Sequence, residues 1–365
     1  MTSIMATSTQ HAIFVKDIGK PLVYGERPIP EPPKGYILIK VLSTMLLPHD
    51  TYGRDQGLFI GERLPYILGT NIAGVVEKLG DDVTSFKIGD HVFGQGNPVY
   101  PTPDSAGLQE YAILDSEAAA KIPEGVEIDD AVSFPVNATT SFEALFHPEN
   151  GFGFPLPFTD TSIFPRANKN IDPATQTVVI IGGGSNVGKL AIQFANIARI
   201  GRIITVASIR NKTSLLSLGA THIIDRHDTP ESIAKQIHDI VQRENITHVY
   251  DCVSWEFSLA LSIVSKTDAS KILTLHPAKS GVALAQEQGF DKCQVQFVAG
   301  GNEFLRPLLK PFWKYLPLWV KEGKIVIPKY RVIEGFDLEL IESALDDYRD
   351  GSPVLPAVVH PQARK

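Results

Sequence analysis

The chain has 365 residues, of which 43% are hydrophobic and 21% charged, and its formal net charge is −7. A chain of this length predicts about two or three domains and can bury a large core. The negative charge argues against a nucleic-acid or anionic-membrane surface. Only two cysteines are present, Cys252 and Cys293, which excludes a disulfide framework and a zinc site made of clustered cysteines.

The N-terminal part of the chain predicts a β domain that follows a polar tail. Met1–Gln10 lacks the apolar segment of a signal peptide, and no apolar run in the chain reaches the ~18 residues that span a bilayer. We therefore expect a cytoplasmic protein with no membrane partner. From Ala12 to Asp115, short β-rich runs alternate with Gly- and Pro-containing turns, which is typical of a barrel-like domain.

Between Thr177 and Ala299 the pattern changes to alternating strands and helices. The expected strands are Thr177–Ile181, Arg202–Ala207, Thr221–Ile224, Thr247–Tyr250, Lys271–Leu275 and Gln294–Val298, and the clearest helices are Val187–Ile200 and Glu231–Gln242. The strands are continuous apolar runs, as expected for parallel strands that are covered by helices on both faces. This half of the chain therefore predicts an α/β fold with a doubly wound nucleotide-binding sheet.

Three further segments complete the predicted organisation. His147–Gln176 has no periodicity, and loops of this length are often functional. Asn302–Gly323 and Leu338–Tyr348 are helical in pattern, and the last expected strand, Ala357–His360, is placed to return to the β domain. We predict a discontinuous catalytic domain, residues 1–137 and 302–365, with a nucleotide domain inserted at 138–301. The loop and the Trp- and Phe-rich helix either shape a substrate entrance or partner surface, or pack on the core.

A glycine-rich turn, Gly182–Gly188, joins the first strand of the predicted sheet to a helix. Small residues let the backbone approach a pyrophosphate, and the start of a helix supplies unpaired amides and partial positive charge. Glycines also form ordinary tight turns, but the strand before the turn, the helix after it and the alternating elements downstream favour a dinucleotide site.

The end of the second strand indicates which dinucleotide binds. An NAD site usually has an acidic residue there, but Ala207 occupies this position and no Asp or Glu occurs between Lys189 and Ile224. The residues that follow are Ser208, Arg210, Asn211 and Lys212. A hydroxyl and two cations suit the 2′-phosphate of NADP(H), although a solvated basic loop would have the same composition.

Motifs along most of the chain resemble the medium-chain dehydrogenase/reductase superfamily. They are the run Ile67–Gly80, Gly89–Gly94, Phe134–Leu145, the glycine-rich turn, Leu218–Ala220 and Gly323–Ile325. This resemblance implies a GroES-like β-barrel domain and a Rossmann domain. Zinc alcohol dehydrogenases of the superfamily have a cysteine, a histidine and a glutamate where this chain has Leu47, Thr70 and Asn71. The resemblance is therefore to the metal-free branch, which includes quinone oxidoreductases and fungal stand-alone enoyl reductases, and no metal is expected.

The resemblance also implies a set of cofactor-binding residues. It places Pro48, His49, Asp50, Thr51 and Thr140 on the nicotinamide-ribose side, Gly184, Ser185, Asn186 and Val187 at the pyrophosphate, Ser208, Arg210, Asn211 and Lys212 at the 2′-phosphate, Arg226 near the adenosine, and Leu275, His276 and Val298 around the nicotinamide amide. Thr140 would also fit as an ordinary helix residue, and His276 as a loop residue before Pro277. Leu47 departs from the quinone reductase pattern, which usually has Asn there.

The expected reaction is hydride transfer from NADPH to an activated C=C bond of an enone, quinone or enoyl thioester. Tyr52 is the candidate catalytic residue that donates to an enolate, although a tyrosine packed with its hydroxyl in solvent would look the same. Asp50 is the second candidate, in a positioning role. The substrate is a small or carrier-bound unsaturated carbonyl compound, as in secondary metabolism, and the protein is a monomer or homodimer. The alternatives are an NADP-binding regulatory protein without turnover, and one-electron quinone reduction.

Overall fold

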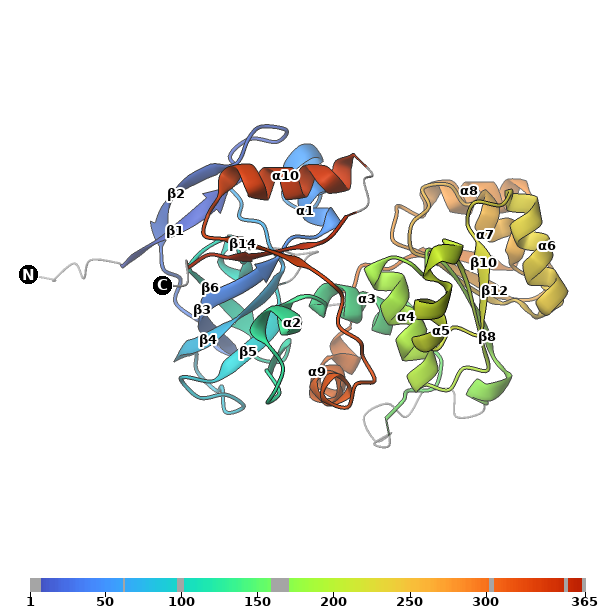
Figure 1. The fold of residues 1–365 in the computed structure, drawn as a ribbon, viewed down its shortest axis with the longest axis horizontal. Helices are drawn as coiled ribbons and strands as arrows, with labels where there is room; N and C mark the ends of the chain where they lie inside the picture. The colour runs from blue at the N-terminus through green and yellow to red at the C-terminus, as the bar shows by residue number, and fades with distance from the viewer. Residues whose placement is uncertain are drawn as a thin grey trace, which may run out of the picture.

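The computed structural model describes residues 8–61, 63–96, 102–158, 171–301, 305–350 and 354–362. Two lobes are visible in Figure 1, with a β-rich lobe on the left and a lobe of helices around a parallel sheet on the right. Helices α3 (Pro135–Phe146) and α9 (Arg306–Lys321) lie between them. None of the described helices is both long enough and apolar enough to cross a membrane.

The β-rich lobe is built around a seven-stranded sheet. Its strands are β3 (Tyr36–Met45), β4 (Asn71–Leu79), β5 (His91–Gln95), β6 (Tyr111–Asp115), β7 (Ala119–Lys121), β14 (Arg331–Glu334) and β15 (Ala357–His360). Strand β3 is central, because its first half pairs with β6, its second half with β15, and its whole length with β4. The last strand of the chain thus returns to the β domain, as expected.

Smaller elements complete this lobe. They are the two-stranded sheet of β1 (Thr9–Phe14) and β2 (Val23–Pro28), helices α1 (Pro48–Gln56), α2 (Ile128–Val132) and α10 (Leu338–Arg349), and the 3₁₀ turn η1 (Pro103–Ser105). Helix α1 packs against α10, which follows it by almost the whole length of the chain. This packing orients α1 at the border between the lobes.

The second lobe contains a six-stranded parallel sheet with the order β10-β9-β8-β11-β12-β13. The strands are β8 (Thr177–Ile181), β9 (Arg202–Ala207), β10 (His222–Asp225), β11 (His248–Asp251), β12 (Ser270–Thr274) and β13 (Cys293–Phe297). The predicted strands therefore agree with the observed ones to within one residue at each end. The order places β8 and β11 at the centre and β13 at an edge, which is the doubly wound arrangement.

Helices cover both faces of this sheet (Figure 1). They are α4 (Asn186–Ile197), α5 (Lys212–Ser217), α6 (Pro230–Ile240), α7 (Ser258–Ile263) and α8 (Lys279–Glu287), with 3₁₀ turns η3 (Pro173–Thr175), η4 (Ile209–Asn211) and η5 (Arg243–Asn245). Val178 and Ile180 of β8 belong to the core on the α4 face, and Val179 and Ile181 to the core on the opposite face. This alternation explains why the strand is apolar at every position.

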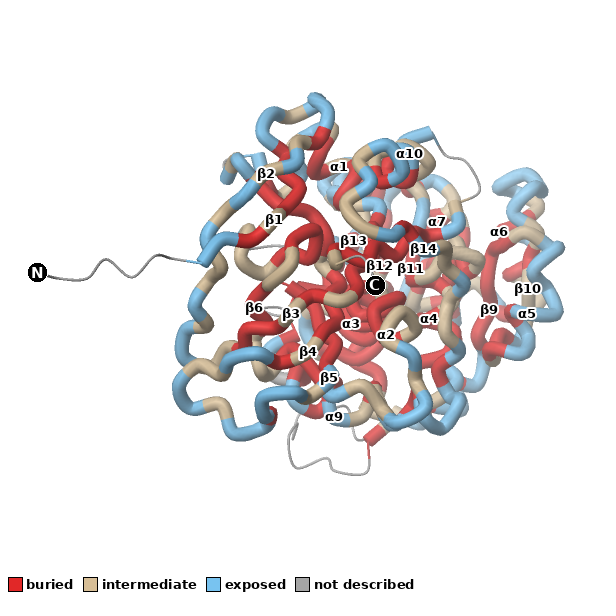
Figure 2. The backbone as a smooth tube through the Cα atoms, turned by 60° about the vertical axis from the view of Figure 1, so that its left-hand side comes forward, coloured by how far each residue is buried: buried red, intermediate tan, exposed pale blue. Residues whose placement is uncertain are grey.

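An aromatic layer lies around Phe142 of α3 and joins the two lobes. Helix α3 itself lies in the buried centre of Figure 2. The ring of Phe142 lies 5.6 Å from Phe194 of α4, 5.0 Å from Phe312 of α9 and 5.7 Å from Phe158, measured between centroids. Of the two interpretations of the Trp- and Phe-rich helix and the long loop, core packing is therefore right for α9 and for Phe158. The middle of the loop, 159–170, lies outside the described residues, as does the predicted domain boundary at 302.

Candidate active site

Helix α1 begins beside a buried carboxylate that fixes its position. Asp50 is 3% exposed; its Oδ2 accepts a hydrogen bond from the Leu47 amide at 2.8 Å, and its Oδ1 accepts one from the Gly69 amide at 3.0 Å. Gly69 has a φ of +91°, and a Cβ there would lie 2.6 Å from Thr44 Oγ1, so only glycine fits this turn. Asp50 therefore ties the N-terminus of α1 to the segment before β4.

A small pocket lies against this helix end. His49 and Thr70 are on its wall, and His49 Nε2 lies 2.5 Å from Thr70 Oγ1 and 3.9 Å from Asp50 Oδ1. Most other lining residues are apolar or aromatic, namely Leu58, Phe59, Ile60, Tyr66, Ile67 and Leu68. An apolar pocket with a few polar atoms on one side is typical of a small-molecule site.

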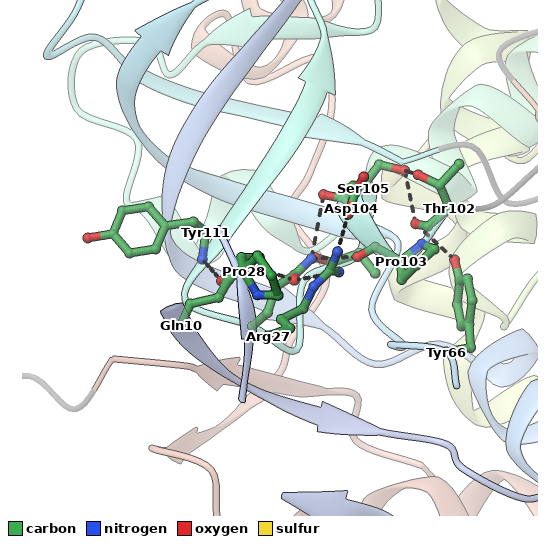
Figure 3. A network of polar contacts seen from close by, with 11 residues as sticks. Gln10, Arg27, Pro28, Tyr66, Thr102, Pro103, Asp104, Ser105 and Tyr111 are labelled. Atoms are coloured by element: carbon green, nitrogen blue, oxygen red, sulfur yellow. Dashed lines mark hydrogen bonds and ion pairs between the residues drawn. The ribbon is translucent and has the colours of Figure 1, made fainter. Parts of the chain in front are cut away.

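A polar network fixes the side of the pocket formed by Ser105 and Ala106 (Figure 3). Arg27 of β2 forms an ion pair with Asp104 and donates to Gln109 Oε1 at 3.2 Å. The Gln109 amide in turn donates to the carbonyl of Ala106 at 2.8 Å. These contacts hold the segment after η1 against the small N-terminal sheet, so the pocket wall is built by residues far apart in the sequence.

The places where zinc alcohol dehydrogenases have ligands do not suit a metal here. Leu47 has no ligating atom, and the hydroxyl of Thr70 is in contact with His49. Among the described residues, no group of three or more His, Cys, Asp or Glu side chains is arranged to hold a metal ion. The side chains at this site therefore do not fit zinc.

The glycine-rich turn after β8 brings helix α4 very close to the sheet. A Cβ on Gly183 would lie 1.9 Å from Thr205 Oγ1, and a Cβ on Gly188 would lie 2.4 Å from the Gly182 carbonyl oxygen. Gly184 differs, because its Cβ would meet only Asn211 Nδ2, at 3.2 Å. Gly183 and Gly188 thus allow the turn to pack closely, whereas Gly184 leaves open space next to the turn.

The start of α4 has amides available for an anion. Ser185 caps the helix, since its hydroxyl donates to the Gly182 carbonyl at 2.8 Å and accepts from the Gly188 amide at 3.0 Å. Within the described ranges, no residue accepts a hydrogen bond from the amides of Gly184, Asn186 and Val187. Free amides at a helix N-terminus fit a pyrophosphate. The hydroxyl and the amide of Ser185 both donate to the Gly182 carbonyl, so this residue has a structural role in the turn.

The predicted 2′-phosphate residues gather at the ends of β9 and β10. The Arg226 amide donates to the Ala207 carbonyl at 3.0 Å, which brings Arg226 beside Ser208. Arg210, Lys212 and Arg226 are exposed, and no carboxylate in the described part of the chain forms an ion pair with them. The nearby Asp225 is already bonded to His227 at 2.9 Å, which lowers the pKa of the carboxyl group. Three cationic side chains without a carboxylate partner therefore lie at the ends of β9 and β10.

The candidate catalytic residue Tyr52 and the predicted nicotinamide residue His276 both contact Trp255 at the border between the lobes. Tyr52 of α1 contacts Trp255 edge to face, with centroids 6.1 Å apart, and Trp255 stacks on His276 at 3.9 Å. Burial lowers the pKa of His276, which favours its neutral ring. Sequence reasoning missed Trp255, although a tryptophan just beyond the carboxyl end of an apolar strand was a usable signal.

Not every predicted residue presents a polar group to this border. The hydroxyl of Thr51 is fully buried and donates to the Leu345 carbonyl of α10 at 2.8 Å. The hydroxyl of Thr140 donates to the Val136 carbonyl within α3 at 2.7 Å. Leu275 directly follows β12, and Val298, only 1% exposed, follows β13, so both lie at the carboxyl edge of the sheet. Pro48 is exposed at the first position of α1.

Comparison with known proteins gives two matching family models and full-length relatives. Residues 33–124 match the alcohol dehydrogenase GroES-like domain, and residues 186–289 match the zinc-binding dehydrogenase family. The trans-enoyl reductase himH of Aspergillus japonicus is 32% identical over 323 residues, which is 86% of each protein.

Two solved structures share the fold. A quinone oxidoreductase of Pseudomonas syringae has a TM-score of 0.74 at 21% identity, over 96% of this chain and 100% of its own. The mycobacterial protein Rv1454c, solved with NADPH, has a TM-score of 0.69 at 21% identity, over 96% of this chain and 100% of its own.

Proposed function

Because this chain belongs to the medium-chain dehydrogenase/reductase superfamily, whose members are oxidoreductases that take a nicotinamide cofactor, we propose that it is an NADPH-dependent reductase of α,β-unsaturated carbonyl compounds. One observation supports this proposal above all, namely that three features occur together in one chain. They are the free amides at the start of α4, the cations beside Ser208 that have no carboxylate partner, and the apolar pocket beside α1. The similarity to a trans-enoyl reductase supports a conjugated acceptor.

The cofactor would lie along the carboxyl edge of the parallel sheet. The amides of Gly184, Asn186 and Val187 would bind its pyrophosphate, and Arg210 and Lys212 would form charge-assisted hydrogen bonds to a 2′-phosphate. Bound NADPH supplies the hydride. Ser208 and Asn211 would add polar contacts to the 2′-phosphate, and Arg226 would lie near the adenosine.

The chain's own groups would orient the acceptor and handle the proton. No described residue forms a hydrogen bond with the Tyr52 hydroxyl, so this hydroxyl is available to donate to the oxygen of an enolate. His49 and Thr70 offer two further polar atoms on the pocket wall. Asp50 acts as a positioning residue, because both of its oxygens accept backbone amides.

The proposed reaction needs only the acceptor, NADPH and a proton donor. A hydride from bound NADPH would reduce the acceptor by two electrons at its β carbon and leave NADP⁺. The Tyr52 hydroxyl would donate a hydrogen bond to the enolate oxygen, and Tyr52 or water would supply the proton at the α carbon as the C=O bond re-forms. Removal of the phenolic hydroxyl in Tyr52→Phe should lower kcat by about tenfold to a hundredfold, with a smaller effect on the affinity for NADPH.

NADPH fluorescence titration and a substrate panel test the proposal. We expect tighter binding of NADPH than NADH, and oxidation of NADPH by enones or enoyl thioesters. Arg210→Ala and Lys212→Ala should each weaken NADPH binding about tenfold without changing NADH binding. The control is Arg202→Ala, which removes an exposed arginine from the opposite, amino end of β9. NADPH binding without oxidation by any acceptor would instead favour a protein without turnover, and a preference for NADH would refute the cofactor assignment.

Four further predictions accompany this function. The proposed domain division is 1–137 and 302–365 around 138–301. The proposed location is the cytoplasm, and the substrate is either free or bound to a carrier. The protein is proposed to be a monomer or a homodimer, and β13 is the edge strand of the parallel sheet that would pair across the two-fold axis of a dimer.

A further inference from the structure

The loop that follows β11 is held firmly over the glycine-rich turn. Asp251 Oδ1 accepts hydrogen bonds from the amides of Val253 at 3.1 Å and Ser254 at 2.9 Å, and the Cys252 amide donates to the Ile181 carbonyl at 3.0 Å. A Cβ on Gly182 would lie 2.5 Å from Val253 Cγ1. The residue that comes next in this loop is therefore presented at a defined place on the carboxyl edge of the sheet.

That residue is Trp255, and it is exposed although it is a large aromatic side chain. Its exposed fraction is 58%, whereas the other two tryptophans of the chain, Trp313 and Trp319, are each 4% exposed. The Trp255 ring stacks on His276 with an interplanar angle of 30°, and the Tyr52 ring stands nearly perpendicular to it at 89°. The rings of Tyr52 and Trp255 thus meet at right angles, and Trp255 is open to solvent.

Helix α1 contributes residues both to the apolar pocket and to the contact with Trp255. His49, Tyr52 and Gly53 are spaced three and four residues apart, so they share one face of the helix. His49 and Gly53 line the pocket, and Tyr52 contacts Trp255. An acceptor whose oxygen accepts a hydrogen bond from the Tyr52 hydroxyl would therefore lie near the exposed ring of Trp255.

We propose that Trp255 and Tyr52 form an aromatic slot that selects planar acceptors whose unsaturated carbonyl is conjugated to an aromatic ring. This inference rests on the proposed function and names the substrate class of the same site. Indole and phenol rings stack on flat π systems, and the exposed neighbour in the loop, Val253, is apolar. Such a surface favours a flat ring over a flexible aliphatic chain.

Steady-state kinetics with two enones tests the selectivity. Benzylideneacetone carries a phenyl ring on the β carbon, and ethylideneacetone carries a methyl group there. For Trp255→Leu we expect the ratio of the two kcat/KM values to fall about tenfold in the direction of the aliphatic enone, mainly through the KM for benzylideneacetone. Trp255→Phe should restore most of the ratio, since it keeps a ring. Ile88→Ala, which shortens an exposed side chain of the β-rich lobe, should leave the ratio unchanged.

Tryptophan fluorescence provides a readout that needs no turnover. With NADP⁺ present, benzylideneacetone should quench the wild-type protein more than Trp255→Phe, in which only the two buried tryptophans emit. The same variant corrects for light absorbed by the acceptor. Quenching of Trp255 fluorescence without NADPH oxidation would refute the proposed function but would still support the aromatic slot.

Three results would overturn the slot itself. The first is activity with no difference in quenching between wild type and Trp255→Phe. The second is an equal loss of both enone activities in Trp255→Leu. The third is a changed Kd for NADPH with an unchanged acceptor ratio, which would assign Trp255 to the cofactor.

Discussion

Glu143 is a buried acid at the place where the chain passes from one lobe to the other. Its side chain lies in α3, is 1% exposed, and accepts a hydrogen bond from the Gly300 amide at 3.0 Å through Oε2. Thr139 and Gln95 donate to the Gly300 carbonyl at 3.1 and 2.9 Å, so the passage is held from both sides. Burial raises the pKa of Glu143 from 4.5 to about 8, against the opposing effect of the Gly300 amide.

Glu143→Gln keeps the shape of the side chain and an oxygen that can accept from the Gly300 amide, but it removes the ionisable carboxyl group. The raised pKa means that the folded protein holds a proton that the unfolded chain releases above pH 4.5. The stabilising effect of this proton is complete below that pH and is lost as the pH rises through about 8. At about 1.4 kcal/mol per pKa unit, the shift corresponds to a loss of about 4–5 kcal/mol across this range.

Thermal and urea unfolding of both proteins from about pH 5 to about pH 9 measures the effect. We expect the stability of Glu143→Gln relative to wild type to increase with pH up to about 8 and then to level off, because above that pH the carboxyl group is ionised in both the folded and the unfolded protein. Glu287→Gln, which changes an exposed glutamate of α8, should give a flat difference. A flat difference for Glu143→Gln as well would refute the reasoning, because it would mean that the buried carboxyl is already ionised at low pH.

Further substitutions test how the site is built. Gly183→Ala should destabilise the fold by about 1–3 kcal/mol, because its Cβ would overlap Thr205. Gly184→Ala should keep the wild-type melting temperature and weaken NADPH binding, and equal melting temperatures of the two variants would contradict these different roles of the two glycines. Asp50→Ala leaves two buried amides without an acceptor and should cost about 2–4 kcal/mol, measured by urea unfolding, with an unchanged midpoint as the opposing result. Thr51→Val should cost about 1 kcal/mol and leave the Kd for NADPH unchanged, so that weakened binding would show that this hydroxyl reaches the cofactor.

The parallel sheet and its glycine-rich turn were predictable from the sequence for a physical reason. Helices cover both faces of β8, so every residue of Thr177–Ile181 is buried and the strand appears as an unbroken apolar run. The close approach of α4 to the sheet requires glycine at Gly183 and Gly188, since any side chain there would overlap a neighbour. Constraints of this kind act on residues close together in the chain, and they therefore leave a local pattern.

Tertiary structure alone determined the direction of individual side chains. Thr51 and Tyr52 are adjacent, yet Thr51 is bonded to α10 and Tyr52 contacts Trp255 of the other lobe. Trp255 and Glu143 had no recognisable motif, because the partners that give them importance, His276 and Gly300, are separated from them by many residues. A side chain's contacts depend on which segments the fold brings together. The sequence by itself therefore determined the family, the parallel sheet and its glycine-rich turn, while the fold decided which side chains meet at the border between the lobes.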